Sequence, residues 1–367
     1  MRRRFPALVI AGALALALVG CSANTEAAGP ASDTITIVDH TGNEVAIPAD
    51  IQRVAIDEIP LASTYVAYQE GSAPYLVGMS DAVVRSLEDT VVADIAPEIL
   101  DVDSGYYDNG ELNVESLLNL DPDVVFYNAN NTGHAELFAA AGIPAVGFST
   151  SGDPTTVYQD WLRLLEDVFQ EPGKMDEVIA RGTEMIDAAA ARTEGLADDA
   201  EQSVLIIFNY SSGTLRVAGE TPFFGYYWLE TINADNAAVG AQGGLAAVTA
   251  EQVLAWDPDV ILIGGSGQAG ITPEQMLSNT VDGLDLSALR AVQEGRVFSN
   301  DLGMWSWFTP NPDAPLIADW LGKVLYPSRF DDVDLIAETR DYYQDVYGVE
   351  LSRDQADSIY QGLFADE

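Results

Sequence analysis

The hydrophobic pattern of the chain begins as an alternation and then changes to short apolar runs. Residues 34–38 (TITIV) alternate apolar and polar side chains, stop at a polar turn and resume at 44–48 (EVAIP), which predicts a β-hairpin. Further strands are predicted at 53–56, 76–78, 124–127 and 145–148, with helical stretches between them. Strands that alternate with helices are typical of an α/β lobe with a mostly parallel sheet.

Two helices are predicted in the middle of the chain. Asp153 and Pro154 supply an N-cap and an N1 proline for a helix that runs to about Phe169. A second helix, at 173–196, carries one apolar stripe at helical spacing, and the strand–helix pattern restarts at Val204. We therefore predict two Rossmann-like α/β lobes, each a mostly parallel sheet with flanking helices, joined by one long α-helix. The predicted boundaries are 33–172 for the N-terminal lobe, 173–196 for the interlobe helix and 197–367 for the C-terminal lobe.

An internal repeat links the two halves. Residues 114–127 (VESLLNLDPDVVFY) and 250–263 (AEQVLAWDPDVILI) share Glu, Leu, Asp-Pro-Asp and Val in register, 136 residues apart. Each copy predicts a short helix, a turn and a buried strand. Solenoid repeats have periods of about 20–50 residues, so this repeat instead indicates two lobes of similar design.

The N-terminus predicts export from the cytoplasm. A basic start (MRRR), an apolar run over 7–19 and the ending LVGC are typical of a secretory signal, which we place at 1–20. Residues 21–32 are small and polar and predict a flexible tether. Cys21 is the only cysteine, so no intrachain disulfide can form. No later uncharged apolar run reaches the ~18 residues of a membrane span.

The charge of the chain limits its partners. It carries 16 Lys and Arg against 58 Asp and Glu, a formal net charge of −42. Such a surface repels nucleic acid and anionic lipid headgroups, so we exclude both as partners. We interpret the acidity mainly as a trait for solubility or salt tolerance, although it is also compatible with cationic ligands.

The usual catalytic and metal-binding patterns are weak or missing. Residues 265–270 match G-x-G-x-x-G, but the acids that follow, Asp282 and Asp285, do not end a predicted strand as a dinucleotide site requires. His40 and His134 are the only histidines, too few for a histidine-rich metal cage. No G-x-S-x-G or S-x-x-K motif occurs. We predict no enzyme and no cofactor, while a carboxylate-only cation site and a glycosidase-type carboxylate pair stay open.

Several of these segments together resemble a known family. The LVGC ending resembles the bacterial lipobox, which implies cleavage before Cys21 and its lipidation, including a palmitate chain. The order of lipobox, tether, hairpin, lobe, helix and lobe resembles the substrate-binding lipoproteins of ABC importers. Within these, the chain is most similar to the branch serving ferric siderophores, vitamin B12, haem and some oxyanions. The hairpin at 35–45, the two repeat copies and the tail at 320–348 carry this resemblance.

The resemblance implies a lipid-anchored protein on the outer face of the cytoplasmic membrane. We expect a monomer that captures a small-molecule metal chelate between its lobes and delivers it to an ABC permease with its ATPase. In the family, the glutamates that open the two repeat copies dock against permease arginines; here these are Glu115 and Glu251. Both also fall at helix starts, where the macrodipole favours a carboxylate.

The expected ligand is a ferric siderophore for the iron transport that this branch serves. Only Arg85 and Arg216 are placed to meet an anionic chelate, so the sequence favours a neutral or cationic, hydroxamate-type complex. Cobalamin, haem and a molybdate-like oxyanion stay open, although an oxyanion needs more hydrogen-bond donors than the sequence identifies. An extracytoplasmic hydrolase is the alternative of another class.

The ligand-binding residues are expected on loops at the carboxyl ends of strands. The candidates are Tyr65, Arg85, Tyr106, Tyr107, Asn128, Tyr210, Arg216, Phe224, Tyr227, Trp305 and Trp307. The same loops also carry Asp57, Glu58, Asn130, Asn131, Phe223, Tyr226, Trp228 and Phe308. Their aromatic rings suit a broad, partly apolar chelate.

Overall fold

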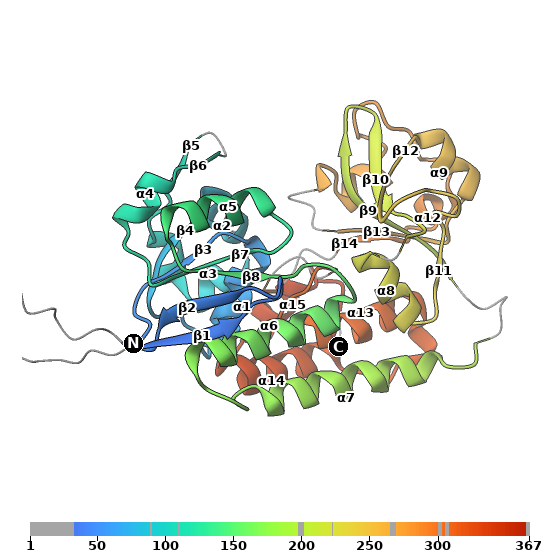
Figure 1. The fold of residues 1–367 in the computed structure, drawn as a ribbon. Coiled ribbons are helices and arrows are strands. Elements are labelled where there is room, and N and C mark those ends of the chain that lie inside the picture. The colour runs from blue at the N-terminus through green and yellow to red at the C-terminus, as the bar shows by residue number, and fades with distance from the viewer. Residues whose placement is uncertain are drawn as a thin grey trace, which may run out of the picture.

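The computed structural model places two lobes side by side on a base of long helices (Figure 1). It describes residues 33–88, 90–108, 111–196, 202–221, 223–264, 269–299, 303–304 and 308–364. The predicted signal peptide and tether, with Cys21, lie outside this part of the chain, as do Trp305 and Trp307. Within it, no helix combines the length and apolar character needed to cross a bilayer.

The N-terminal lobe contains a parallel sheet, as the sequence predicted. Strands β1 (Thr34–Val38) and β2 (Glu44–Pro48) form the expected hairpin. The sheet has the order β4-β3-β7-β8, and all its pairs are parallel. Its strands are β3 (Val54–Ile56), β4 (Leu76–Met79), β7 (Val124–Asn128) and β8 (Ala145–Phe148). The remaining elements are α1 (Ile59–Tyr68), α2 (Asp81–Leu87), α3 (Val91–Ile95), η1 (Pro97–Asp101), the short hairpin β5 (Tyr107–Asp108) and β6 (Glu111–Leu112), α4 (Val114–Asn119) and α5 (Thr132–Ala141).

The C-terminal lobe has a mixed sheet of order β12-β10-β9-β13-β14, with β11 beside β9. Its strands are β9 (Ser203–Ser211), β10 (Thr214–Ala218), β11 (Asp235–Asn236), β12 (Leu245–Val248), β13 (Val260–Ile263) and β14 (Val297–Ser299). Ser212 and Gly213, with φ of 52° and 82°, join β9 to β10 in a two-residue hairpin turn, which makes this pair antiparallel. The helices are α8 (Phe224–Thr231), α9 (Ala250–Trp256), α11 (Pro273–Leu277) and α12 (Arg290–Gln293).

The base is a layer of helices beneath the two lobes (Figure 1). They are α6 (Pro154–Phe169), α7 (Asp176–Thr193), α13 (Ala314–Leu325), η2 (Pro327–Arg329), α14 (Leu335–Tyr347) and α15 (Arg353–Ile359). Helix α7 runs beneath both lobes and packs closely on α13, where a Cβ on Gly182 would lie 2.9 Å from Pro315 Cγ (Figure 1). Helix α14 packs against both α13 and α1 of the N-terminal lobe. One hydrophobic core therefore continues through the base into both lobes.

The two repeat copies fold alike, as α4–β7 and α9–β13. Asp121 and Asp257, the first aspartates of the Asp-Pro-Asp turns, both have a φ of 45°. The second aspartate of each turn accepts a backbone N–H at the start of the neighbouring central strand: Asp123 from Arg53 at 2.9 Å, and Asp259 from Ser203 at 3.0 Å. Each copy thus fastens a short helix to its own sheet, and α4 and α9 lie on the side of the molecule away from α7 (Figure 1).

Candidate binding cleft

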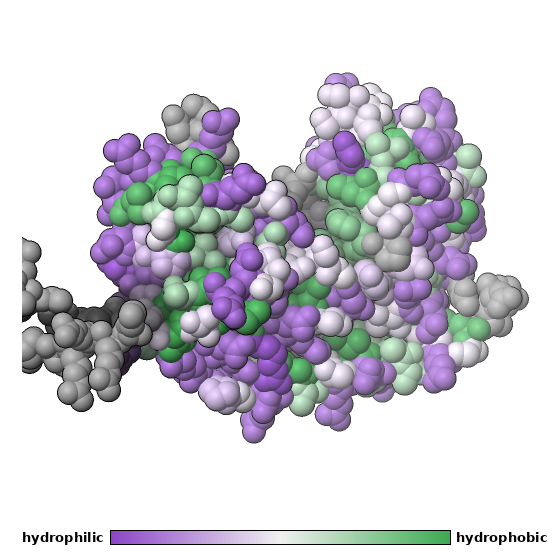
Figure 2. Space-filling view, viewed as in Figure 1, coloured by the Kyte–Doolittle hydropathy of each residue, from purple (hydrophilic) through white to green (hydrophobic). Residues whose placement is uncertain are grey.

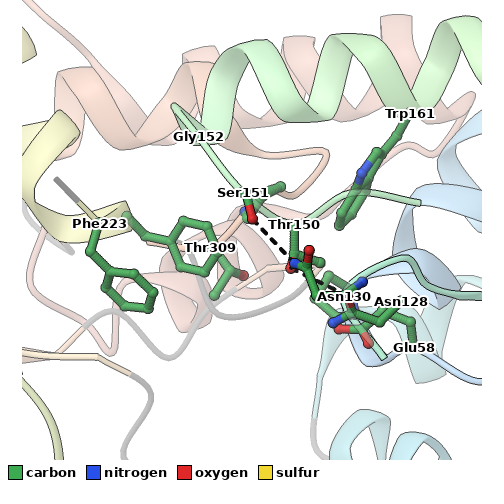
Figure 3. A pocket seen from close by; sticks show the side chains of 12 residues that line it. Glu58, Asn128, Asn130, Thr150, Ser151, Gly152, Trp161, Phe223 and Thr309 are labelled. Atoms are coloured by element: carbon green, nitrogen blue, oxygen red, sulfur yellow. Dashed lines mark hydrogen bonds between the residues drawn. The ribbon is translucent and has the colours of Figure 1, made fainter. Parts of the chain in front are cut away.

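A cavity of about 440 Å³ lies between the two lobes, where the surface is hollowed (Figures 2 and 3). It is lined by Glu58, Pro60, Asn128, Asn130, Thr150, Ser151, Gly152, Trp161, Phe223, Phe224, Thr309 and Pro310. Most of these residues follow the carboxyl ends of β3, β7 and β8, or precede α8 across the gap. Its volume falls in the range of about 300–1,000 Å³ that is usual for small-molecule sites.

Uncharged polar groups form the wall on the N-terminal lobe. The Asn130 amide Nδ2 donates to the Thr150 hydroxyl at 2.9 Å and to the Ser151 hydroxyl at 3.2 Å. The Asn128 side-chain oxygen accepts the Asn130 backbone N–H at 2.9 Å. These bonds hold two amides and two hydroxyls together at the rim of the sheet, where they can bind the oxygens of a ligand.

Glu58 adds a titratable group to this wall. Burial raises the pKa of the Glu58 carboxyl to about 7; a hydrogen bond with Asn128 opposes the shift, and the nearby Asp57 carboxylate adds to it. Near neutral pH, Glu58 therefore exists both as an acid that can donate a hydrogen bond and as a carboxylate that repels anions.

Asp57 lies next to this wall and ties three elements together. Its carboxylate accepts the Tyr107 hydroxyl from the β5–β6 hairpin and lies 2.6 Å from His134 Nδ1 on α5. The hydrogen bond with Asp57 raises the pKa of His134, although burial acts in the opposite direction. Tyr107 thus binds Asp57, and it does not line the cavity.

Aromatic side chains form the opposite wall (Figure 3). The Phe223 and Phe224 rings lie 4.5 Å apart between centroids, and Phe208 packs against Phe223 at 5.6 Å. Trp161 of α6 lies on the other side of the cavity, near Asn128 and Thr150, where it is fully buried and donates its Nε1 hydrogen to the Ser149 carbonyl at 2.6 Å (Figure 3). The side formed by Phe223 and Phe224 is therefore apolar, and the side on the N-terminal lobe is mainly polar.

A buried carboxylate anchors the loop that brings Thr309 and Pro310 to the cavity. Asp313 has no solvent exposure and accepts the hydroxyls of Tyr343 and Tyr347, each at 2.7 Å. It also accepts the Met304 N–H at 2.8 Å. Because both tyrosines belong to α14, this cluster fastens the loop to the base.

Two of the predicted ligand-binding residues, Asn128 and Phe224, line the cavity, together with Glu58, Asn130 and Phe223 from the same loops. The structure does not bring Tyr65 and Tyr106 to the cavity. Both side chains are almost completely buried, with hydroxyls donated to the carbonyls of Pro74 and Ile56, because their helix or loop turns them towards the core.

The other predicted residues that the structure describes do not line the cavity. Arg85 is exposed on α2 and pairs with Asp81, and Arg216 is exposed on β10. Tyr210 donates its hydroxyl to the Asp282 carbonyl at 2.8 Å, and Tyr227 packs on its neighbour in α8. No cationic side chain therefore lines the cavity in the described part of the chain.

Sequence reasoning missed the segment 150–152 of the polar wall. It follows β8 directly, so the rule that parallel strands end at one edge of a sheet could have identified it. Trp161 carried no such signal, because its place at the cavity depends on how α6 is rotated. The hydroxyls of Thr150 and Ser151, which accept the two Asn130 amide hydrogens and can donate their own, are hydrogen-bond donors that the sequence analysis did not identify.

A ligand-sized cavity between two α/β lobes, walled by strand-end loops, is typical of solute-binding proteins. The chain belongs to the periplasmic binding protein family, whose model matches residues 62–301. It is therefore an extracytoplasmic solute-binding protein of an ABC importer and not an enzyme, as the sequence predicted.

Relatives align over nearly the whole chain. The molybdate-binding protein MolA of Haemophilus influenzae is 28% identical over 364 residues, which cover 92% of this chain and 98% of MolA. The structure of MolA bound to molybdate has a TM-score of 0.73 at 25% identity, covering 87% of this chain and 99% of MolA. A periplasmic solute-binding protein from Veillonella parvula has a TM-score of 0.78 at 26% identity, covering 91% and 99%. FepB from Veillonella parvula, with a TM-score of 0.64 at 18% identity over 87% and 97% of the two chains, shares the fold.

Proposed function

We propose that the solute is a small oxyanion of the molybdate class. The observation that carries this proposal is the polar wall, where Asn130, Thr150 and Ser151 bring amide and hydroxyl groups together. The Asn130 amide hydrogens are taken by the two hydroxyls, so the Thr150 and Ser151 hydroxyls can turn their own hydrogens towards the oxygens of an anion without the cost of burying a counter-charge. The similarity to MolA over 92% of the chain supports the same ligand class.

A hydroxamate-type ferric siderophore is the second candidate. The paired rings of Phe223 and Phe224 and the absence of a lining cation among the described residues favour a neutral, partly apolar chelate. The cavity of about 440 Å³ is also larger than a single oxyanion needs. One water molecule occupies about 30 Å³ in the liquid, so the cavity has room for several waters beside the anion. We expect bound water to fill the remaining space around an oxyanion.

A ligand panel decides between the two candidates. The mature protein is titrated with molybdate, tungstate, sulfate, a ferric hydroxamate, cobalamin and haem, and binding is followed by tryptophan fluorescence, to which the lining Trp161 contributes. We expect molybdate and tungstate to bind at micromolar concentration. Tighter binding of the ferric hydroxamate would select the second candidate, and no response to any ligand would contradict both.

A matched pair of variants tests the polar wall. Asn130→Leu removes the amide that orients the Thr150 and Ser151 hydroxyls and should weaken oxyanion binding about 10- to 150-fold, because a hydrogen bond to a charged group contributes about 1.5–3 kcal/mol. The control Asn119→Leu changes an exposed asparagine on α4, far from the cavity, and should leave affinity unchanged. Equal affinity in both variants would exclude Asn130 from the site.

We also propose lipid anchoring through Cys21 and permease docking through Glu115 and Glu251. The proposal is supported by the exposure of both glutamates in the first turns of α4 and α9. Close charge pairs across interfaces can contribute about 1.5–7 kcal/mol. The double reversal Glu115→Lys and Glu251→Lys should abolish transport and leave solute affinity unchanged. A parallel loss of affinity would contradict a docking role.

A further inference from the structure

Two exposed leucines occupy equivalent positions in the repeat. The large hydrophobic side chains exposed in the described residues are Val38, Tyr75, Leu118, Leu137, Val239, Leu245, Leu254, Leu277 and Leu363. Leu118 of α4 is 47% exposed and Leu254 of α9 is 38% exposed. They are 136 residues apart, the period of the repeat. A single exposed leucine is ordinary, but the same leucine in both copies requires a common cause.

Each leucine shares a helix face with a proposed docking glutamate. Leu118 follows Glu115 by three residues and Leu254 follows Glu251 by three, a spacing that places side chains side by side on a helix. The two helices also begin in the same way. The N-cap Asn113 accepts the Ser116 N–H at 3.0 Å, and the N-cap Thr249 accepts the Gln252 N–H at 3.4 Å.

The core does not need these leucines. In each copy the preceding residue, Leu117 or Val253, is fully buried and holds the helix to its lobe. The outward leucine therefore contributes little to folding and leaves an apolar group beside a carboxylate. Figure 2 shows apolar surface on both lobes at the side that carries α4 and α9.

We propose that each lobe docks to the permease through a two-part contact, in which the glutamate pairs with a cation and the leucine enters an apolar recess beside it. This inference rests on the proposed docking role of Glu115 and Glu251. A chain with a net charge of −42 is attracted to any cationic surface, so charge alone does little to determine the position in which the protein docks on the permease. A leucine acts only on contact and only where the partner has a matching recess, so two of them fix where the protein sits.

Docking to the permease–ATPase complex in nanodiscs, measured by surface plasmon resonance, separates the two parts. Burying a leucine contributes about tenfold in affinity. The double variant Leu118→Gln and Leu254→Gln should therefore weaken docking about 100-fold, and by the same factor at low and high salt. Glutamine suits the test because its helix propensity is close to that of leucine. The pair Glu115→Gln and Glu251→Gln should weaken docking strongly at low salt and little at high salt, because salt screens exposed charges.

Leu277→Gln is the matched control, since Leu277 is 42% exposed on α11 outside the repeat. It should dock like the wild type, and all variants should keep their solute affinity and melting temperature. Normal docking of the leucine variants alongside failure of the glutamate variants would overturn this inference and leave the proposed docking role intact. Normal docking of both sets would overturn the docking role itself. Equal loss in Leu277→Gln would show a general effect of surface polarity and would also overturn the inference.

Discussion

The ionisation of Glu58 should control the affinity for an oxyanion. Burial raises the pKa of this cavity-lining carboxyl to about 7, so raising the pH through 7 places a negative charge in the cavity. A dianion is repelled by that charge, whereas the protonated acid can donate a hydrogen bond to it. Replacing Glu58 with glutamine keeps a neutral donor at the same place at every pH.

The size of the effect follows from the population of the protonated form. With a pKa of about 7, roughly 90% of Glu58 is protonated at pH 6 and roughly 10% at pH 8. If only the protonated form binds, the apparent dissociation constant is the intrinsic one divided by that fraction. Affinity should therefore fall about tenfold from pH 6 to pH 8 in the wild type and stay constant in Glu58→Gln.

Isothermal titration with molybdate at pH 6, 7 and 8 measures this dependence. Glu136→Gln, which neutralises an exposed carboxylate on α5, is the control and should keep the dependence of the wild type. Wild-type affinity that is flat or rises with pH would refute the reasoning, because Glu58 would then not face a bound anion. Titration with a neutral ferric chelate over the same pH range should give a flat profile, so the two titrations together separate the candidate ligands.

Three further predictions concern the framework of the site. Asp313→Asn weakens a fully buried acceptor of two tyrosine hydroxyls and a backbone N–H, and should lower the free energy of unfolding in urea by about 2–4 kcal/mol; an unchanged midpoint would contradict this. Gly182→Ala forces α7 away from α13 and should cost about 1–3 kcal/mol in thermal unfolding; a stability gain would show that the helices separate freely. Asp57→Asn should lower the pKa of His134, measured by NMR titration, since the hydrogen bond with Asp57 raises it. The pKa of His40, which burial lowers, serves as the internal reference; an unmoved His134 would place the cause elsewhere.

The sequence predicted elements better than it predicted side-chain directions. Apolar runs located β3, β7, β8 and β13 because buried strands leave a continuous hydrophobic signal. The antiparallel pairing of β10 with β9 in the second lobe was not predicted, since it depends on the two-residue turn at Ser212 and Gly213.

Which side chains reach the ligand depends on how each helix or strand is rotated about its own axis. The spacing of residues in the sequence does not determine this rotation. Tyr65 and Tyr106 follow strands or loops that lead to the cleft, yet both side chains turn into the core. Asn130 and Thr150 meet only because β7 and β8 are neighbours in the sheet, a pairing that the linear order suggests without fixing.

The continuous core of the base has a consequence for the transporter. Helix α13 packs on both α7 and α14, and α14 also packs on the first lobe, so the lobes are connected by several helices and not by α7 alone. We expect this rigid base to keep the distance between α4 and α9 constant. The distance between these two helices would then be the same in the loaded and the empty protein. If the permease binds α4 and α9 as proposed, it would distinguish the loaded from the empty protein through contacts at the mouth of the cleft.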